Sequence, residues 1–197
     1  MKKLRTLQFL AALAVSVTAA KAELLTFEDL GSFDELYDGY HGFNWDNLYT
    51  YDTTGASPSG YPNGVVSGHN VVFNSGGSDG MVIASSGQFD FNSAYFTAAW
   101  NDGLTLQAIG YNGASIVYSN SWTLNTSGPL FINFNYLGVT SVTLHTFGGT
   151  NHGYSGNGEH FALDNLTING SVPDSGMTVL LLGLGLSSLL AFRRRLG

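Results

Sequence analysis

The chain has 197 residues, of which 44% are hydrophobic and 13% aromatic, a size that suits one folded domain with a sizeable core. It contains no cysteine, which excludes disulfides, thiol nucleophiles and metal sites built on thiolates. All seven Lys and Arg residues lie in the first 21 or the last five positions, and every carboxylate except Asp174 lies between Glu23 and Asp164. A domain this acidic repels nucleic acid and offers no cationic side chain to a phosphate, so nucleic-acid binding is excluded.

Residues 1–22 have the features of a secretory signal peptide. A basic start precedes an apolar run from Leu7 to Ala20, and Ala20-Lys21-Ala22 has the small residues of a cleavage site. We therefore expect export, with the mature chain beginning at Glu23. An uncleaved anchor is the alternative, and the shortness of the apolar run speaks against it.

Residues 23–171 are predicted to form a single all-β domain. The segment is rich in Gly, Asn, Ser and Thr, and none of it sustains the apolar spacing of a long helix. Short alternating runs recur about every eight to twelve residues with turn residues between them, which is typical of a β-sandwich. We expect a jelly-roll-like sandwich, with a small barrel as the alternative.

The clearest strand signals surround Asn112-Gly113. Apolar residues alternate with polar ones over 104–108 before this pair and over 116–124 after it, and again over 130–136. An Asn-Gly pair between two such runs predicts a hairpin with a type I′ turn, because both central residues of that turn need a positive φ.

The first and last predicted strands both carry carboxylates. The last, 161–168, changes phase at Asp164-Asn165, where a β-bulge would re-aim the side chains. The first, 25–30, carries Glu28 and Asp29. If the two strands lie side by side, as first and last strands of sandwiches often do, these carboxylates converge.

Converging carboxylates in a domain without Lys or Arg must be compensated by solvent, by backbone donors or by a bound cation. Because Ca²⁺ is held by carboxylate, amide and carbonyl oxygens, we predict a structural Ca²⁺. Its predicted ligands are Glu28, Asp29, Asp164 and Asn165. An early acidic residue combined with a late Phe-x-x-Asp-Asn strand resembles jelly-roll carbohydrate-binding modules. Solvated carboxylates at strand ends are the alternative.

Aromatic residues form the second candidate site. Four stand in polar, Gly-rich segments and are predicted to be exposed as a stacking platform for sugar rings: Trp45, Tyr49, Tyr61 and Tyr154. Trp100 and Trp122 belong to apolar runs and are expected in the core. The ligand expected for such a platform is extracellular polysaccharide, and burial in the core is the alternative for these rings.

No motif indicates an enzyme. The chain lacks a Gly-x-Ser-x-Gly elbow, its acidic domain has no lysine for a phosphate loop, and its five histidines do not follow a metal-binding spacing and are expected in surface loops. We therefore expect no catalytic residue, and a secreted hydrolase is only the third alternative.

The C-terminus has three consecutive parts: the motif Val172-Pro173-Asp174-Ser175-Gly176, the apolar run 177–192, and the cluster Arg193, Arg194 and Arg195 within the basic tail 193–197. The apolar run predicts a transmembrane helix, and the arginines that follow it are expected on the cytoplasmic side.

This tail resembles the bacterial PEP-CTERM sorting signals, in particular the VPDSG-CTERM variant. The resemblance implies that an exosortase recognises the tail, cuts near the motif and passes the protein toward the cell surface or its matrix. We therefore predict an exported, inner-membrane-anchored precursor of a non-enzymatic surface or matrix protein. A carbohydrate-binding module with a structural calcium is the alternative function, and a plain C-terminal anchor is the alternative for the tail.

Overall fold

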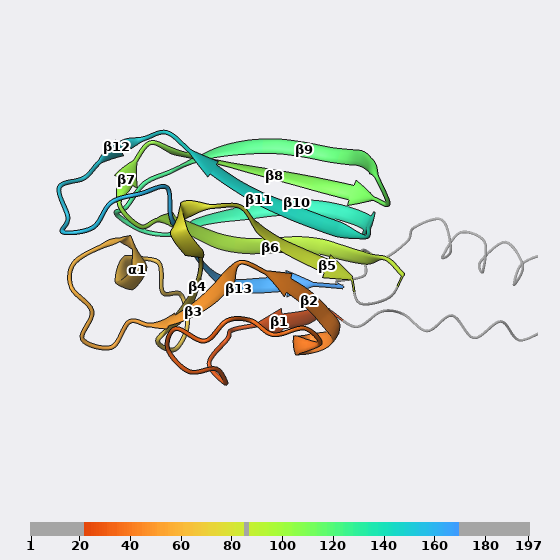
Figure 1. Ribbon diagram of the computed structural model, residues 1–197, viewed down its shortest axis with the longest axis horizontal. Coiled ribbons are helices and arrows are strands. Elements are labelled where there is room, and N and C mark those ends of the chain that lie inside the picture. Colours follow the sequence, from red (N-terminus) through yellow and green to blue (C-terminus); the bar gives the residue numbers. More distant parts are fainter. Residues whose placement is uncertain (1–21, 85–86, 170–197) are drawn as a thin grey trace, which may run out of the picture.

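The computed structural model describes residues 22–84 and 87–169, which form two stacked antiparallel sheets (Figure 1). Sheet A contains β1 (Glu23–Leu25), β3 (Leu48–Asp52), β4 (Asn70–Asn74), β6 (Phe89–Ala98), β10 (Leu130–Val139) and β13 (Phe161–Ile168). Sheet B contains β2 (Phe43–Asp46), β5 (Gly80–Ala84), β8 (Leu104–Asn112), β9 (Ser115–Leu124) and β11 (Ser141–Phe147). The short strands β7 (Asn101–Asp102) and β12 (Thr150–Asn151) pair with each other at one end.

The strand order is jelly-roll-like. Sheet A runs β10-β6-β13-β4-β3, with β1 also paired to β13, and sheet B runs β2-β5-β11-β8-β9. Within the described residues, β3–β4 and β8–β9 are the only sequence neighbours paired in these sheets, so most connections cross from one sheet to the other. The prediction of an all-β sandwich is confirmed.

The main core fills the space between the sheets, and it follows from the alternation of the strands. On β8, Leu104, Leu106 and Ala108 are fully buried while the residues between them are partly exposed. On β10, Ile132, Phe134 and Tyr136 point inward while the intervening residues are exposed. Each inward side chain removes apolar surface from water, which stabilises the fold by about 25 cal/mol for each Å² buried.

The hairpin between β8 and β9 forms as predicted, but the prediction of a type I′ turn was wrong. Asn112 pairs with Ser115, which makes Gly113 and Ala114 the central residues of the turn. Of these four residues only Gly113 has a positive φ, of 59°. The turn therefore needs one left-handed residue rather than two, and glycine supplies it without a steric cost.

The predicted bulge at Asp164-Asn165 is confirmed. The register of β13 against β6 shifts between Asp164 and Thr167, and Asn165 has a φ of 52°. The first and last strands also lie side by side, because β1 pairs with the second half of β13. However, the predicted strand over 25–30 is wrong: β1 ends at Leu25, and Phe27 turns the chain with a φ of 61°.

A second, smaller core covers the outer face of sheet A. It contains Tyr61, Val71, Ala99 and Ala162, and Trp100 packs against it. Tyr61 belongs to α1 (Gly60–Asn63), which contacts β6 and β13. This layer also supplies walls of a hollow on the surface, through Tyr61 and Trp100.

Residues 1–21 of the predicted signal peptide and the C-terminal segments at 172–197 lie outside the described residues. Within 22–84 and 87–169, no helix has the length and hydropathy that crossing a bilayer requires.

Candidate functional site

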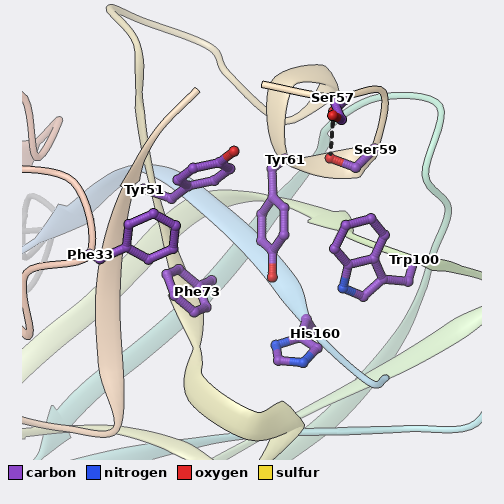
Figure 2. A pocket seen from close by; sticks show the side chains of 8 residues that line it. All are labelled: Phe33, Tyr51, Ser57, Ser59, Tyr61, Phe73, Trp100 and His160. Carbon is purple, nitrogen blue, oxygen red and sulfur yellow. Dashed lines mark hydrogen bonds between the residues drawn. The ribbon is translucent and has the colours of Figure 1, made fainter. Parts of the chain in front are cut away.

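A hollow of about 320 Å³ opens on the outer face of sheet A, beside α1 (Figure 2). That volume is at the lower end of the range of small-molecule sites. Its walls are mostly aromatic, and the lining residues are Phe33, Tyr51, Ser57, Ser59, Tyr61, Phe73, Trp100 and His160.

Sheet A supplies one wall through the alternation of two paired strands. On β4, Val72 points into the main core, so Phe73 faces outward. On β3, Thr50 is buried and Tyr51 faces outward. Because Tyr51 pairs with Val71, it lies diagonally across from Phe73.

The short helix α1 places Tyr61 at the centre of the hollow. Two glycines bring the helix against the sheet: the N–H of Gly60 donates to the carbonyl of Ala99 at 2.8 Å, and Gly64 packs over Ala162. The Tyr61 ring is then edge-on to Trp100, with ring centres 5.4 Å apart. Burial raises the pKa of Tyr61, so its hydroxyl stays protonated at neutral pH and can donate a hydrogen bond.

Trp100 closes the opposite wall (Figure 2). Its carbonyl accepts from the N–H of His152 at 2.8 Å, which ties the loop after β12 to the end of β6. Gly156 lies directly against the indole, where an added Cβ would come within 2.4 Å of the ring. The glycine therefore covers one side of Trp100 and fixes the ring.

His160 supplies a neutral polar group. Its Nδ1 lies 2.8 Å from the carbonyl of Asn74, so Nδ1 carries the proton and donates it. Burial lowers the pKa of His160, which favours the neutral ring at pH 7 and leaves Nε2 as an acceptor. Asn74 is itself buried and accepts from the N–H of Phe161 at 2.9 Å, which anchors the strand that follows His160.

Phe33 lies at the edge of the hollow with an exposed ring and an unusual backbone conformation. Its side chain is 66% exposed, and its backbone has a φ of 63°, which is a genuine outlier for a bulky residue. Two hydrogen bonds to β3 hold it there: its N–H donates to the carbonyl of Thr50 at 2.7 Å, and the N–H of Thr50 donates to the carbonyl of Asp34 at 2.8 Å. Its ring lies 5.0 Å from that of Tyr51. Backbone strain that costs about 1–3 kcal/mol is typical of ligand-binding positions.

The hollow can therefore bind a small, flat-faced, uncharged molecule. Phe33, Tyr51 and Phe73 offer apolar ring surface, while the tyrosine and serine hydroxyls and His160 offer hydrogen bonds without charge. Among the described residues that line it there is no carboxylate, so the pair of acids used in glycoside hydrolysis is not found here.

The four aromatic residues predicted to bind a ligand do not form one platform. Tyr61 lines the hollow, although it is buried rather than exposed as expected. Tyr49 is half-buried beside it, 6.0 Å from the Phe73 ring. Tyr154 packs against His152, with ring centres 4.4 Å apart, in the loop that also carries Gly156.

The predicted exposure of Trp45 was wrong. Only 6% of Trp45 is exposed, and its indole N–H donates to the carbonyl of Tyr40 at 3.0 Å. It alternates with Asn44 and Asp46 on β2, so the polar neighbours mark the outward face of the strand rather than exposure of the ring. Trp45 does border a second, more polar hollow together with Glu35 and Asp38.

Sequence reasoning missed Phe33, Phe73 and His160. Phe73 could have been found, because Val72 and Phe73 lie in a short run of β-branched and aromatic residues, where alternation puts one of them outside. His160 was expected in a surface loop, but it is half-buried against Phe73. Phe33 carries no local signal, because its conformation is imposed by β3.

Asp164, one of the predicted calcium ligands, is completely buried. Its Oδ2 accepts from the N–H of Val66 at 2.7 Å and of Ser67 at 2.9 Å, and its Oδ1 accepts from the N–H of Asn165. Burial raises the pKa of Asp164, the charge of Glu28 raises it further, and the three N–H donors oppose both. Asn165 accepts a hydrogen bond from the Ser67 hydroxyl.

Glu28 and Asp29 also have protein partners. Glu28 accepts from the N–H of His69 at 3.0 Å and of Asn70 at 2.8 Å, and Asp29 accepts from the Tyr40 hydroxyl at 2.7 Å. Backbone donors from residues 66–70 thus compensate two of these carboxylates, one of the possibilities open from the sequence. Across the part of the chain that the structure describes, no three His, Asp or Glu side chains gather as metal ligands do. The calcium site stays a prediction.

The described residues thus form a β-sandwich with an aromatic hollow on the outer face of sheet A. Beyond the sandwich, residues 171–196 match the family described as the VPDSG-CTERM motif. The resemblance of the tail to VPDSG-CTERM signals is thereby confirmed, and the match includes residues 172–176. This match supports a protein that is exported and directed to the cell surface.

Other comparisons say less. A search of curated proteins finds no match. The K2 cleaved adhesin domain of Lys-gingipain aligns over 76% of this chain and 98% of its own, with a TM-score of 0.45 and 10% identity. TmCBM61, solved in complex with β-1,4-galactotriose, aligns over 73% of this chain and 92% of its own, with a TM-score of 0.37 and 11% identity. Scores this low leave the role of the sandwich to be argued from its own surface.

Proposed function

We propose that this chain is an exported protein that an exosortase sorts through its C-terminal signal, and that its sandwich then binds neutral polysaccharide at the cell surface or in the matrix. The observation that carries the binding role is the exposed Phe33, held in a strained backbone at the edge of an aromatic hollow. A ring in that position adds little to the core, and a flat apolar ligand gives it a function.

The charge of the domain favours a neutral sugar. Between Ala22 and Val172 there is no Lys or Arg, so an acidic polysaccharide would meet thirteen carboxylates and no permanent cation. Neutral sugars need apolar surface for their ring faces and uncharged partners for their hydroxyls. The hollow offers both, through Phe33, Tyr51 and Phe73 on one side and through Tyr61, the serines and His160 on the other.

Replacing Phe33 by Ala tests this role without touching the core. We expect binding of a neutral oligosaccharide to weaken about 5- to 30-fold, because the loss of one stacked ring costs about 1–2 kcal/mol. The probes are cellotetraose, mannotetraose and galactotetraose, with polygalacturonate as the acidic comparison. Binding is followed by titration calorimetry and by tryptophan fluorescence, to which Trp100 in the wall of the hollow contributes.

The matched control is Phe131→Ala, because Phe131 is also an exposed phenylalanine, at 53%, but lies on β10 and not among the residues of the hollow. This variant should bind like the unmodified protein. If no neutral probe binds, or if the two variants lose affinity equally, the hollow is not the binding site.

Sorting is tested by the mass of the protein recovered from its own cells. We expect an intact mass that corresponds to a chain beginning at Glu23 and ending between Val172 and Gly176, in the surface or matrix fraction. A chain that runs from Glu23 to Gly197 in the membrane fraction would make the tail a plain anchor. The binding role stands or falls separately, since it rests on the sandwich alone.

A further inference from the structure

The outermost strands of the two sheets, β1, β3 and β10 in sheet A and β2 and β9 in sheet B, differ in how they are protected against pairing with another chain. An edge strand presents N–H and C=O groups to any strand that approaches, and proteins usually shield it by shortness, charge, bulges or a covering loop. β1 has only three residues, while β2, β3 and β10 each show one of these features, and β9 is the least protected.

The edge of β3 is covered by its own chain. The N–H of Leu36 donates to the carbonyl of Leu48 at 2.9 Å, and the Phe33 and Asp34 backbones bond to Thr50 from the same side. β2 has only four residues and carries the exposed Asp46. β10 is long, but its register shifts twice, between Asn133 and Tyr136 and again before Val139.

The edge of β9 has ten residues, with neither proline nor formal charge. Among the described strands it pairs with β8 alone, and it lies along the margin of the molecule in Figure 1. One register shift, near Val117, interrupts the hairpin end, while residues 118–124 pair regularly with β8. Its exposed residues there are small and polar, including Ser119, Ser121 and Thr123. Such a strand is a template for one more antiparallel strand.

Charge and topology select the strand that can occupy this edge. Residues 103–158 contain no Asp, Glu, Lys or Arg, so β9 lies in the uncharged part of an otherwise acidic domain. A second copy can approach here without bringing its carboxylates close. Because the other outermost strands of that copy are shielded, the strand that it offers is its own β9.

We propose that two copies of this chain associate through β9, which pairs antiparallel with β9 of the other copy and joins the two B sheets into one. The same edge is used on both sides, so the contact closes as a dimer and does not continue into a fibre. One pair of strands buries less surface than the roughly 1,200–2,000 Å² of a stable interface, so the affinity is low. The dimer therefore forms at high local concentration. A cell surface provides that concentration.

The absence of natural cysteine makes a sharp test possible. Cysteine is introduced singly at Ser119, Ser121 or Thr123 in the full-length protein, which is purified in detergent and oxidised gently. Directly opposed residues of an antiparallel pair bring their Cα atoms within the roughly 4.4–6.8 Å that a disulfide needs. We expect a disulfide-linked dimer from at least one β9 position, several-fold above the control.

The control is Asn133→Cys, which places an exposed thiol on the bulged edge of β10. Adding a lysine on β9 beside the reactive cysteine should abolish the cross-link, because it sets like charges across the strand pair. The proposal is overturned if no β9 position cross-links above Asn133→Cys, whether the protein then stays monomeric or associates elsewhere. It is also overturned if the added lysine has no effect.

Discussion

Replacing Asp164 by Ala is expected to lower the free energy of unfolding by about 2–4 kcal/mol, among the largest effects of a single side chain in this protein. Asp164 is fully buried and accepts three backbone N–H groups, two of them from Val66 and Ser67 in the segment before β4. Alanine leaves these donors without their acceptor. Urea denaturation followed by tryptophan fluorescence measures the loss.

Two further variants sharpen this measurement. Asp164→Asn keeps one oxygen for the N–H groups of Val66 and Ser67, so its loss of stability should be smaller than that of Asp164→Ala. Asp46→Ala removes an exposed carboxylate and should change stability by less than about 0.5 kcal/mol. Equal stability of Asp164→Ala and Asp46→Ala would show that the buried carboxylate does not hold the segment 66–70.

Lowering the pH should increase the contribution of Asp164 to the free energy of unfolding, whereas it decreases that of an ordinary paired aspartate. Its pKa is raised in the folded protein, mainly by burial, so the folded state binds the proton more tightly than the unfolded state does. The extra stability from this protonation is therefore fully present below pH 3.8, the pKa of Asp164 in the unfolded chain. It is lost as the pH rises through the higher pKa of the folded protein. Asp164→Asn removes this dependence, which isolates it from the other carboxylates.

The same variants separate the calcium prediction from the backbone role. If Ca²⁺ binds at Glu28, Asp29, Asp164 and Asn165, the melting temperature of the unmodified protein rises with added Ca²⁺, and Asp164→Ala abolishes that rise. If Asp164 acts through its hydrogen bonds alone, Asp164→Ala melts earlier by the same margin with Ca²⁺ or with a chelator.

Much of the sandwich could be predicted because strands leave a local signal. The alternation over 104–108 and 130–136 places the buried side chains correctly, and the change of phase at Asp164-Asn165 locates the bulge. These features depend on the period of a single strand, which the sequence carries directly. The turn after β8 shows the limit, since one residue of register decides its type.

The hollow could not be predicted in this way. Its residues come from segments between Phe33 and His160, and they meet only after both sheets have formed. Tyr61 was singled out because it stands in a polar, Gly-rich segment, and it does line the hollow, but the fold buries it instead of exposing it. Phe33 owes its strained backbone to hydrogen bonds with β3, and no pattern in the neighbouring sequence predicts them.

Replacing Gly60 by Ala is the second change with a large expected effect, because it removes one wall of the hollow through the backbone. An added Cβ at this position would lie 1.7 Å from the carbonyl oxygen of Ala98 and 2.9 Å from the Cα of Ala99. These are atoms of the backbone at the end of β6, so a side-chain rotation cannot relieve the contact. Helix α1 must therefore lift off the sheet and take Tyr61 with it.

We expect a loss of about 2–4 kcal/mol from this variant, because Tyr61 and the residues beneath it become exposed. For a domain of this size that lowers the melting temperature by roughly 5–15 °C. Gly128→Ala is the matched control, since a Cβ there meets no atom within 4 Å. If the two variants melt together, α1 does not depend on the contact at Gly60. If Gly60→Ala is destabilised but binds neutral oligosaccharide normally, the ligand does not use the hollow.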